Sequence, residues 1–289
     1  MTEPLHSANF DELAVALPAH ISHPLLKQLA TRLQSQFFPQ DYKRPIVAGW
    51  PDIQDDDGQG QDPNRPNNQT MSRHFEAAAS DAGASSSATN TSFVPDHEIS
   101  QGALILETLF QAPIADASVL IAITNESHPR LLLTKRAGHL AAHAGEISFV
   151  GGKHETVDGN NVVTALREAC EETALPPRQV QVLGQLPVQT SKSGMSVRPI
   201  VALIPPDLTL VPEPGEIERI FWADFAVLIE QPLEEYAINY SLSGNNLVLL
   251  TPSWVVDGET VWGLTGLILA SLLELCFDRK IEWYYRAQA

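Results

Sequence analysis

Short apolar runs alternate with two helical patterns from about residue 103 to the end of the chain, and this alternation is the strongest constraint on the fold. Apolar runs of this length, bounded by turn residues, indicate strands. The predicted strands cover residues 118–124, 131–134, 180–186, 197–204, 217–222 and 247–250. The predicted helices cover residues 162–173 and 264–277. Strands interleaved with helices predict a mixed α/β domain over residues 103–289, although the pattern does not give the strand order.

The first 50 residues contain one amphipathic helical pattern, which begins near residue 22 and ends near residue 37. Its apolar stripe consists of Leu25, Leu29, Leu33 and Phe37. A short amphipathic helix needs a partner surface to cover such a stripe. We therefore predict that residues 1–50 form an N-terminal helical segment that packs on the domain at 103–289. A contact within a homodimer is the alternative use of the same stripe.

Residues 51–102 differ sharply in composition from the rest of the chain. They contain few large apolar residues and include runs of aspartate at 55–57 and of serine at 85–87. A segment of this kind cannot bury enough surface to offset the entropy that ordering would cost. We expect an acidic, low-complexity linker or insert that is disordered, and we do not interpret the aspartate run as a metal site.

The net charge excludes some classes of partner. The chain has 18 Lys and Arg against 35 Asp and Glu, which gives a formal net charge of −17. Strong electrostatic binding to nucleic acid or to an anionic membrane is therefore not expected. The apolar stretch at 261–273 is shorter than the roughly 20 residues that span a bilayer. With only 2 cysteines and no secretory signal pattern, a cytoplasmic protein is the simplest expectation.

The helix predicted at 162–173 has one packed face and one carboxylate face. Glu168, Glu171 and Glu172 are related as i, i+3 and i+4, so their carboxylates lie within one helical turn. We place these glutamates on the exposed face, opposite the stripe that contains Leu166. Like charges so close repel one another, and a bound cation would remove that repulsion. Carboxylate oxygens are the ligands that Mg²⁺ and Mn²⁺ prefer.

Taken alone, a Glu-x-x-Glu-Glu pattern is more often an ordinary solvated helix face, with Arg167 paired to Glu171. The preceding Gly151 and Gly152 change this balance. Glycines allow the backbone to approach a ligand closely, and a free carbonyl can complete the oxygen shell of a metal. Loop and helix together predict a cation site beside a cradle for phosphates.

These residues resemble the signature of the Nudix hydrolases, GX5EX7REUXEEXGU, where U is aliphatic. The match begins at Gly152, continues through the segment Arg-Glu-Ala-Cys-Glu-Glu at 167–172, and closes at Leu175. Asp158 stands near the place of the first Glu, with one residue more between it and Arg167. Ala174 replaces the final Gly, which removes an easy left-handed helix end, and we expect the prolines at 176 and 177 to stop the helix instead.

A closer resemblance extends beyond this signature to the coenzyme A pyrophosphatase branch of the family. The resemblance rests on Leu-Leu-Leu-Thr-Lys-Arg at 131–136, on the segment His143 to Gly152, and on Val-Trp-Gly-Leu-Thr at 261–265. It spans roughly residues 117–277. Two departures bear on the substrate: Val150 replaces the Pro of Phe-Pro-Gly-Gly, and Ala141 lies where many members carry an Arg. Basic residues that can take the place of this Arg are Arg136, Lys135, Lys192 and Arg198.

The resemblance implies an α/β/α sandwich with a mixed sheet, in which residues 103–289 form the Nudix domain. It also implies hydrolysis of a pyrophosphate bond with Mg²⁺ or Mn²⁺. We assign the metal ligands to Glu168, Glu172, Glu171 and the Gly152 carbonyl. We expect Arg167 to orient the carboxylates and Glu216 to act as general base, with a helix glutamate as the alternative base. Substrate contacts are assigned to Arg136, Gly151 and Gly152.

The substrate that the resemblance favours is coenzyme A or a derivative, cleaved to 4′-phosphopantetheine and 3′,5′-ADP. A second reading keeps the chemistry and changes the substrate to ADP-ribose, a dinucleotide or another nucleoside diphosphate derivative. A third is a Nudix-fold binding module without turnover, whose usual mark is loss of the signature glutamates. Glu168, Glu171 and Glu172 are all present, which favours catalysis.

Overall fold

The fold is described from a computed structural model, which defines residues 21–35, 109, 112–242 and 245–281. All of these residues belong to one compact unit. Phe37 of the predicted stripe and the whole segment 51–102 lie outside the described residues, as does most of 1–50. None of the described helices is both long and apolar enough to cross a bilayer.

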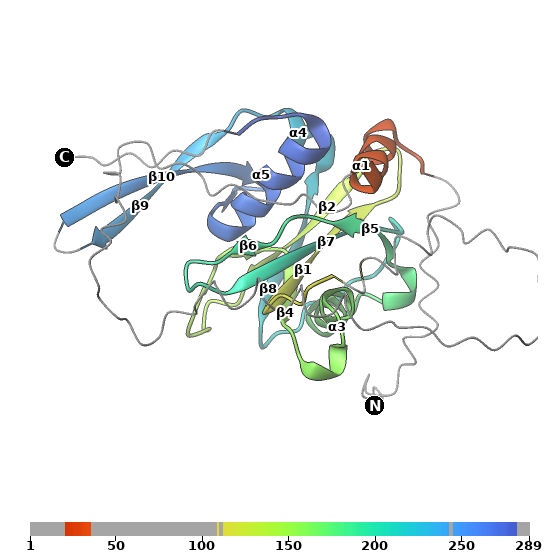
Figure 1. The fold of residues 1–289 in the computed structure, drawn as a ribbon, viewed down its shortest axis with the longest axis horizontal. Coiled ribbons are helices and arrows are strands. Elements are labelled where there is room, and N and C mark those ends of the chain that lie inside the picture. The colour runs from red at the N-terminus through yellow and green to blue at the C-terminus, as the bar shows by residue number, and fades with distance from the viewer. Residues whose placement is uncertain (1–20, 36–108, 110–111, 243–244, 282–289) are drawn as a thin grey trace, which may run out of the picture. The chain divides into compact units, whose positions relative to one another are not determined.

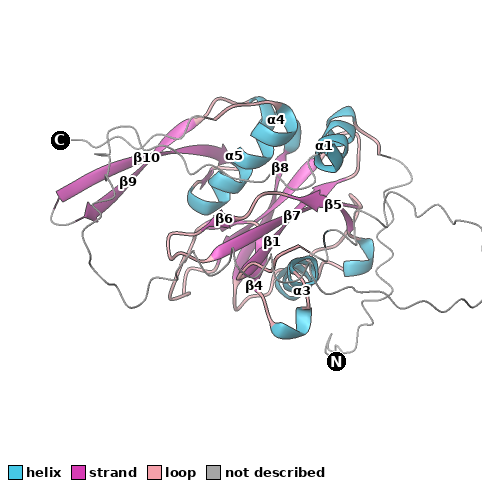
Figure 2. Cartoon of the chain, in the orientation of Figure 1, coloured by secondary structure: helices cyan, strands magenta, loops and turns pink. Residues whose placement is uncertain are grey.

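The centre of the unit is a mixed sheet (Figure 1; Figure 2). Five strands follow the order β3, β2, β1, β7, β5, with β4 paired to β1, β6 to β7 and β8 to β2. Their bounds are β1 Ala117–Thr124, β2 Arg130–Arg136, β3 Ile147–Ser148, β4 Val150–Lys153, β5 Gln181–Gln185, β6 Gln189–Thr190, β7 Ser196–Ile204 and β8 Ile217–Asp224. Strands β1 and β7 are parallel and the other pairs are antiparallel. The five predicted strands of this sheet, β1, β2, β5, β7 and β8, all appear, because each of these runs is buried on at least one face.

Helices cover both faces of this sheet. Helix α3, Asn161–Thr173, packs on one face through a cluster that includes Leu120, Leu166 and Ile200. The opposite face carries α1, Pro24–Ser35, α4, Phe225–Glu230, and α5, Gly263–Phe277, around a larger cluster. Figure 1 shows α3 on one side of the strands and these three helices on the other. The predicted α/β/α sandwich with a mixed sheet is confirmed.

Helix α1 packs against α5 and β5, although some 80 residues of sequence separate it from the first sheet strand. Its buried residues are Leu26, Leu29, Ala30 and Leu33. The predicted stripe is wrong at one position, because Leu25 is only partly buried and Leu26 is the residue that points into the core. Leu33 lies against Gly184, where the lack of a side chain on β5 allows close packing.

A second, three-stranded antiparallel sheet follows α4. It consists of β9 Glu234–Leu242, β10 Asn245–Val256 and β11 Glu259–Val261. Only the middle of β10 was predicted, because β9 begins with two glutamates and lacks an apolar run. Trp254 of β10 is fully buried and contacts the position of Gly266, near the start of α5, so this sheet is joined to the larger core.

Candidate functional site

Two glycines bring β4 unusually close to its neighbours. Gly151 has a φ of +153°, and a Cβ at this position would meet the Ser118 carbonyl and Val119 of β1. A Cβ on Gly152 would meet the carboxylate of Glu168 on α3. Only glycine fits at 151, where a Cβ would meet backbone atoms, whereas a side chain at 152 would displace the Glu168 carboxylate. The predicted glycine loop is therefore a strand that the carboxylate side of α3 can approach directly.

Glu172 is buried against this strand. Its exposed fraction is 3%, and the Gly151 N–H donates a hydrogen bond of 3.0 Å to Glu172 Oε2. Arg136 Nη1 lies 3.7 Å from the other carboxylate oxygen. Burial raises the pKa of the Glu172 carboxyl to about 8; the Gly151 N–H and Arg136 oppose this, and the charges of Glu168 and Glu216 add to it.

The prediction that Glu172 lies on an exposed helix face is wrong. The helical pattern places the glutamates opposite Leu166 correctly, but β4 covers that side of the helix as well, because α3 packs closely against β4. The three glutamates differ accordingly in environment. The Glu168 side chain is 16% exposed and that of Glu171 is 47% exposed. Burial also raises the pKa of Glu168, whereas the Arg167 charge lowers it.

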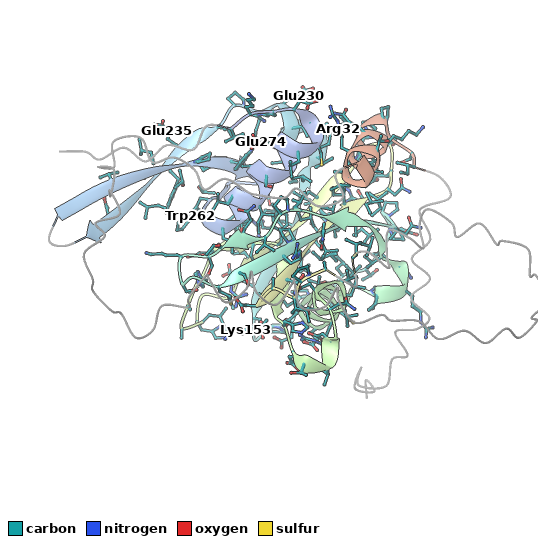
Figure 3. All side chains as sticks on the ribbon, in the orientation of Figure 1. Arg32, Lys153, Glu230, Glu235, Trp262 and Glu274 are labelled. Atoms are coloured by element: carbon teal, nitrogen blue, oxygen red, sulfur yellow. The ribbon has the colours of Figure 1, made fainter. Side chains whose placement is uncertain are left out.

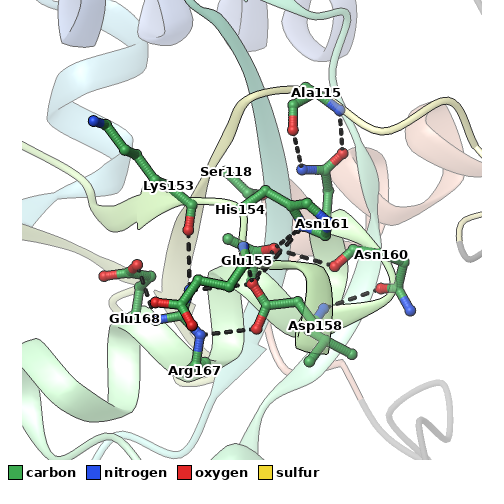
Figure 4. Close-up of polar contacts among 12 residues, drawn as sticks. Ala115, Ser118, Lys153, His154, Glu155, Asp158, Asn160, Asn161, Arg167 and Glu168 are labelled. Atoms are coloured by element: carbon green, nitrogen blue, oxygen red, sulfur yellow. Dashed lines mark hydrogen bonds and ion pairs between the residues drawn. The ribbon is translucent and has the colours of Figure 1, made fainter.

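Arg167 holds the carboxylate cluster together, as Figure 4 shows. Its guanidinium donates to Asp158 at 2.8 and 3.1 Å, to the Lys153 carbonyl at 3.0 Å and to Glu171 at 3.1 Å. It also lies 3.0 Å from Glu168. The hydrogen bond to Asp158 raises the pKa of Arg167, while burial opposes this. Every donor direction of this side chain is directed at the protein, which supports an orienting role.

Asp158 is the partner that the sequence did not reveal, although it stands near the place of the first signature Glu. It lies at the end of a short 3₁₀ turn, Thr156–Asp158, and its side chain is 1% exposed. Burial alone would raise its pKa, but hydrogen bonds from Arg167, from the Glu155 N–H and from the Thr164 hydroxyl hold the pKa below its usual value. Glycine at 159 and the Asn160 cap then start α3.

Both ends of α3 are fixed by local contacts. The Asn160 side chain accepts hydrogen bonds of 3.0 Å from the N–H groups of Val162 and Val163. The Asn161 amide exchanges two hydrogen bonds with the backbone of Ala115, visible in Figure 4. At the other end Ala174 adopts a left-handed conformation with φ of 56°, so the helix ends there without the glycine and before the two prolines.

The loop that precedes β8 is attached to the C-terminal end of α3. The Val211 N–H donates to the Thr173 carbonyl and the Glu213 N–H donates to the Glu172 carbonyl, each at 2.9 Å. The Glu216 carbonyl accepts from the Ala137 N–H at 2.8 Å. Glu216 is exposed, and its charge raises the pKa of both Glu168 and Glu172. The loop thus brings Glu216 to the buried carboxylates, where the sequence placed it as a candidate base.

The structure separates Arg136 from the other basic candidates. Lys135 faces away from the cluster, at 3.1 Å from Glu259 and 3.4 Å from Glu218. Arg198 donates to the Pro113 carbonyl at 2.9 Å. Arg136, by contrast, lies beside the signature glutamate Glu172. Of the two departures, Val150 is fully buried under α3 and Ala141 lies exposed in the loop between β2 and β3.

The donor chemistry fits a divalent cation. Within the described residues no group of three or more His, Cys, Asp or Glu side chains is already arranged as a metal shell. However, burial raises the carboxyl pKa values of Glu168 and Glu172, and the nearby charge of Glu216 adds to both. Arg136 is the one cation near Glu172 among the ion pairs of the described residues. This site has an excess of oxygen ligands and of negative charge, which a hard cation would offset.

Comparisons with known proteins identify the family. Residues 115–242 match the family model described as the NUDIX domain. The chain is 38% identical over 166 residues to the Nudix hydrolase NudL of Salmonella paratyphi B, covering 57% of this chain and 83% of that protein. The NudL protein of Salmonella enteritidis matches with the same identity and coverage. A MutT/nudix family protein from Enterococcus faecalis superposes with a TM-score of 0.37 and 12% identity, over 75% of this chain and 72% of that one.

The chain therefore belongs to the Nudix hydrolase family. It is a pyrophosphohydrolase, of a family that generally uses divalent metal ions.

Proposed function

We propose that this enzyme hydrolyses the pyrophosphate bond of coenzyme A or its derivatives, giving 4′-phosphopantetheine and 3′,5′-ADP. The observation that carries the proposal is the position of Arg136. This residue ends the Leu-Leu-Leu-Thr-Lys-Arg segment that resembles the coenzyme A branch, and its guanidinium lies 3.7 Å from Glu172. A cation at that point can contact the phosphates of a substrate whose scissile bond lies over the carboxylates.

The proposed roles follow from the environments of the side chains. Glu168, Glu172, Glu171 and the Gly152 carbonyl would hold Mg²⁺ or Mn²⁺. When bound there, such a cation would supply positive charge to offset that of the pyrophosphate and would make water a better nucleophile. Glu216 accepts the proton of the attacking water, because it is exposed beside the cluster and forms no ion pair with any of the residues that the structure describes.

The other residues of the proposed site position the metal ligands and contact the substrate. Arg167 keeps Glu168 and Glu171 in place through its anchor on Asp158. Gly151 and Gly152, the proposed substrate contacts, let β4 lie against β1 and against the Glu168 carboxylate, so the backbone of this strand lies beside the cluster. The ligand set and the base are proposals that rest on these contacts.

The substrate is tested by incubating the purified full chain with coenzyme A, ADP-ribose and NADH in the presence of Mg²⁺ or Mn²⁺, and by resolving the products chromatographically. We expect 3′,5′-ADP from coenzyme A and slower cleavage of the other two. Faster cleavage of ADP-ribose or NADH would replace coenzyme A by the second substrate class. Absence of all cleavage would contradict the proposed activity.

The base is separated from the metal ligands by two variants. Glu216→Gln should lower kcat by about 10² to 10⁴ and keep the rise in melting temperature on adding Mg²⁺. Glu168→Gln should lose both the turnover and the rise in melting temperature on adding Mg²⁺. Glu274→Gln, a change at an exposed glutamate of α5, is the matched control and should change neither. Loss of the Mg²⁺ response in Glu216→Gln would show that Glu216 is a ligand and not the base.

A further inference from the structure

The segment that links β4 to α3 folds around the guanidinium of Arg167. Lys153, the last residue of β4, offers its carbonyl to Arg167 at 3.0 Å, and Asp158 accepts at 2.8 and 3.1 Å. Figure 3 shows Lys153 on the side of the sheet that carries α3. The proposed metal ligands lie on both sides of this link, because the Gly152 carbonyl precedes it and Glu168 follows it on α3. Contacts that fix the link therefore also fix the relative positions of the ligands.

One more side chain of this link reaches α3. His154 follows β4 directly, and its Nδ1 lies 2.8 Å from the hydroxyl of Thr164, in the first turn of α3. The same hydroxyl lies 2.9 Å from Asp158 Oδ2 and 3.2 Å from the Asn160 carbonyl. Thr164 is fully buried, and the His154 side chain is 15% exposed. A chain of hydrogen bonds thus runs from His154 to Asp158 and on to Arg167, three residues that Figure 4 shows together.

The direction of these hydrogen bonds follows from a single proton. A hydroxyl has one hydrogen and donates one hydrogen bond. The pKa of Asp158 lies below its usual value, so this carboxylate is ionised, and it is closer to the hydroxyl than the Asn160 carbonyl is. The Thr164 hydroxyl therefore donates to Asp158. His154 must then donate from Nδ1, and this N–H keeps the hydroxyl turned toward Asp158.

The orientation of Asp158 sets the orientation of Arg167. The guanidinium donates to both carboxylate oxygens, from Nε to Oδ1 and from Nη2 to Oδ2, and such a two-point contact fixes the guanidinium plane. The remaining nitrogen, Nη1, lies 3.0 Å from Glu168 and 3.1 Å from Glu171. A turn of the Asp158 carboxylate would therefore move Nη1 relative to both glutamates.

We infer that His154 and Thr164 are positioning residues for the metal ligands of α3. They act through the ion pair of Asp158 with Arg167, and neither residue has to contact the metal or the substrate. Removing a group that orients the ligands of a metal lowers affinity or activity by about 10- to 100-fold. The inference rests on the ligand set of the proposed function, and it does not depend on which substrate the enzyme cleaves.

The test measures the affinity of the full chain for Mn²⁺ without substrate, from the electron paramagnetic resonance signal of the free ion. Thr164→Val keeps the shape of the side chain without the hydroxyl, and it should weaken Mn²⁺ binding by about tenfold or more. His154→Leu should weaken it by about threefold, because the hydroxyl can then turn to the Asn160 carbonyl.

Conservative variants should rescue the affinity. Thr164→Ser keeps the hydroxyl, and His154→Asn keeps an N–H donor close to the place of Nδ1. Both should bind Mn²⁺ as the wild type does. In the double variant His154→Leu, Thr164→Val, the loss should equal that of Thr164→Val alone, because both changes act through one hydroxyl.

Two controls separate positioning from loss of stability. Leu29→Ala opens a cavity on the opposite face of the sheet, so it should lower the melting temperature and leave the Mn²⁺ affinity unchanged. Glu168→Gln removes a proposed ligand and marks the full loss of binding. Melting temperatures in a chelator identify any variant that fails to fold. If Thr164→Val does so, His154→Leu, at a residue that is not fully buried, decides the test.

Two results would overturn the inference. One is a Mn²⁺ affinity equal to that of the wild type in both Thr164→Val and His154→Leu, while Glu168→Gln loses binding. The other is additive losses in the double variant, because the two side chains would then act separately. Absence of Mn²⁺ binding by the wild type would overturn the ligand set and the inference with it. Cleavage of coenzyme A enters none of these measurements, so a wrong substrate is distinguished from a wrong positioning role.

Discussion

At the scale of single residues, the main finding is that folding buries the carboxylate of Glu172. Glu172 accepts one backbone hydrogen bond and has one cation at 3.7 Å, which does not balance its burial, so its pKa rises to about 8. The cost of this position explains why a cation is expected there. A protein that stores unfavourable charge at its active site gains stability when a ligand of opposite charge binds.

Replacing Glu172 by Gln should therefore raise the free energy of unfolding at pH 7 in the presence of a chelator, by about 2 kcal/mol. The folded pKa of Glu172 lies above the unfolded value, so its ionisation destabilises the fold increasingly as pH rises toward 8. The difference between variant and wild type should vanish below about pH 4. Urea unfolding from pH 4 to 8 measures it. A variant less stable than wild type across this range would contradict the buried, uncompensated carboxylate.

The same substitution should abolish the stabilisation by metal. Wild type should gain melting temperature on adding Mg²⁺, and Glu172→Gln should gain little and lose turnover. Equal gains in the two proteins would remove Glu172 from the set of ligands.

The contribution of Asp158 to stability changes with pH in the opposite direction to that of Glu172. Hydrogen bonds hold its pKa below the unfolded value, so its contribution to stability is present above about pH 4 and is lost as pH falls further. Asp158→Asn should cost about 3 kcal/mol at pH 7, because Arg167 then keeps a buried charge without its main partner. Unfolding at pH 7 and pH 3 should show the cost shrinking in acid. A cost that does not depend on pH would indicate lost packing and not a lost ion pair.

At the scale of elements, the end of α3 shows a local strain that the sequence signals. Ala174 stands in a left-handed conformation that favours glycine. Ala174→Gly should raise the free energy of unfolding by about 0.5 kcal/mol, the strain relieved minus the entropy that glycine adds to the unfolded chain. Ala169→Gly, inside the same helix and buried, is the control and should destabilise. A loss of stability in Ala174→Gly would show that no strain is stored there.

Sequence reasoning located most elements because apolar runs and helical periodicity survive in the fold. It predicted α3 and α5 to within one residue at each end and the strands β1, β2, β5, β7 and β8 closely. It missed β9, where Glu234 and Glu235 begin a strand whose partner is mainly β10. It misjudged Glu172 because a helix pattern identifies a face and not what covers it. The signal was present in Gly151 and Gly152, whose missing side chains let β4 approach that face.

At the scale of the whole molecule, the helix α1 belongs to the same core as the sheet. Leu26 and Leu29 are fully buried in the cluster that also contains Trp254 and the apolar side of α5. Gln28 donates to the Cys276 carbonyl at 2.9 Å, and Arg32 contacts Asp278 at the end of α5. The residues before and after the acidic segment therefore form one cooperative unit, and α1 covers one side of its core.

This arrangement predicts the effect of shortening the chain between α1 and β1. The buried residues of both clusters come from positions 26–33 and 109–281 among those described, and the composition of 51–102 predicts an insert that contributes no core. Removing residues 55–90 leaves 36–54 and 91–108 to connect the two parts. The deletion should leave melting temperature and kcat within error of the full chain.

Leu29→Ala should lower the free energy of unfolding by about 3 kcal/mol, both in the full chain and in the shortened chain, because it opens a cavity in the core between α1 and α5. A cost of Leu29→Ala that disappears in the shortened chain would show that α1 no longer reaches its site, and that the acidic segment is needed to deliver it.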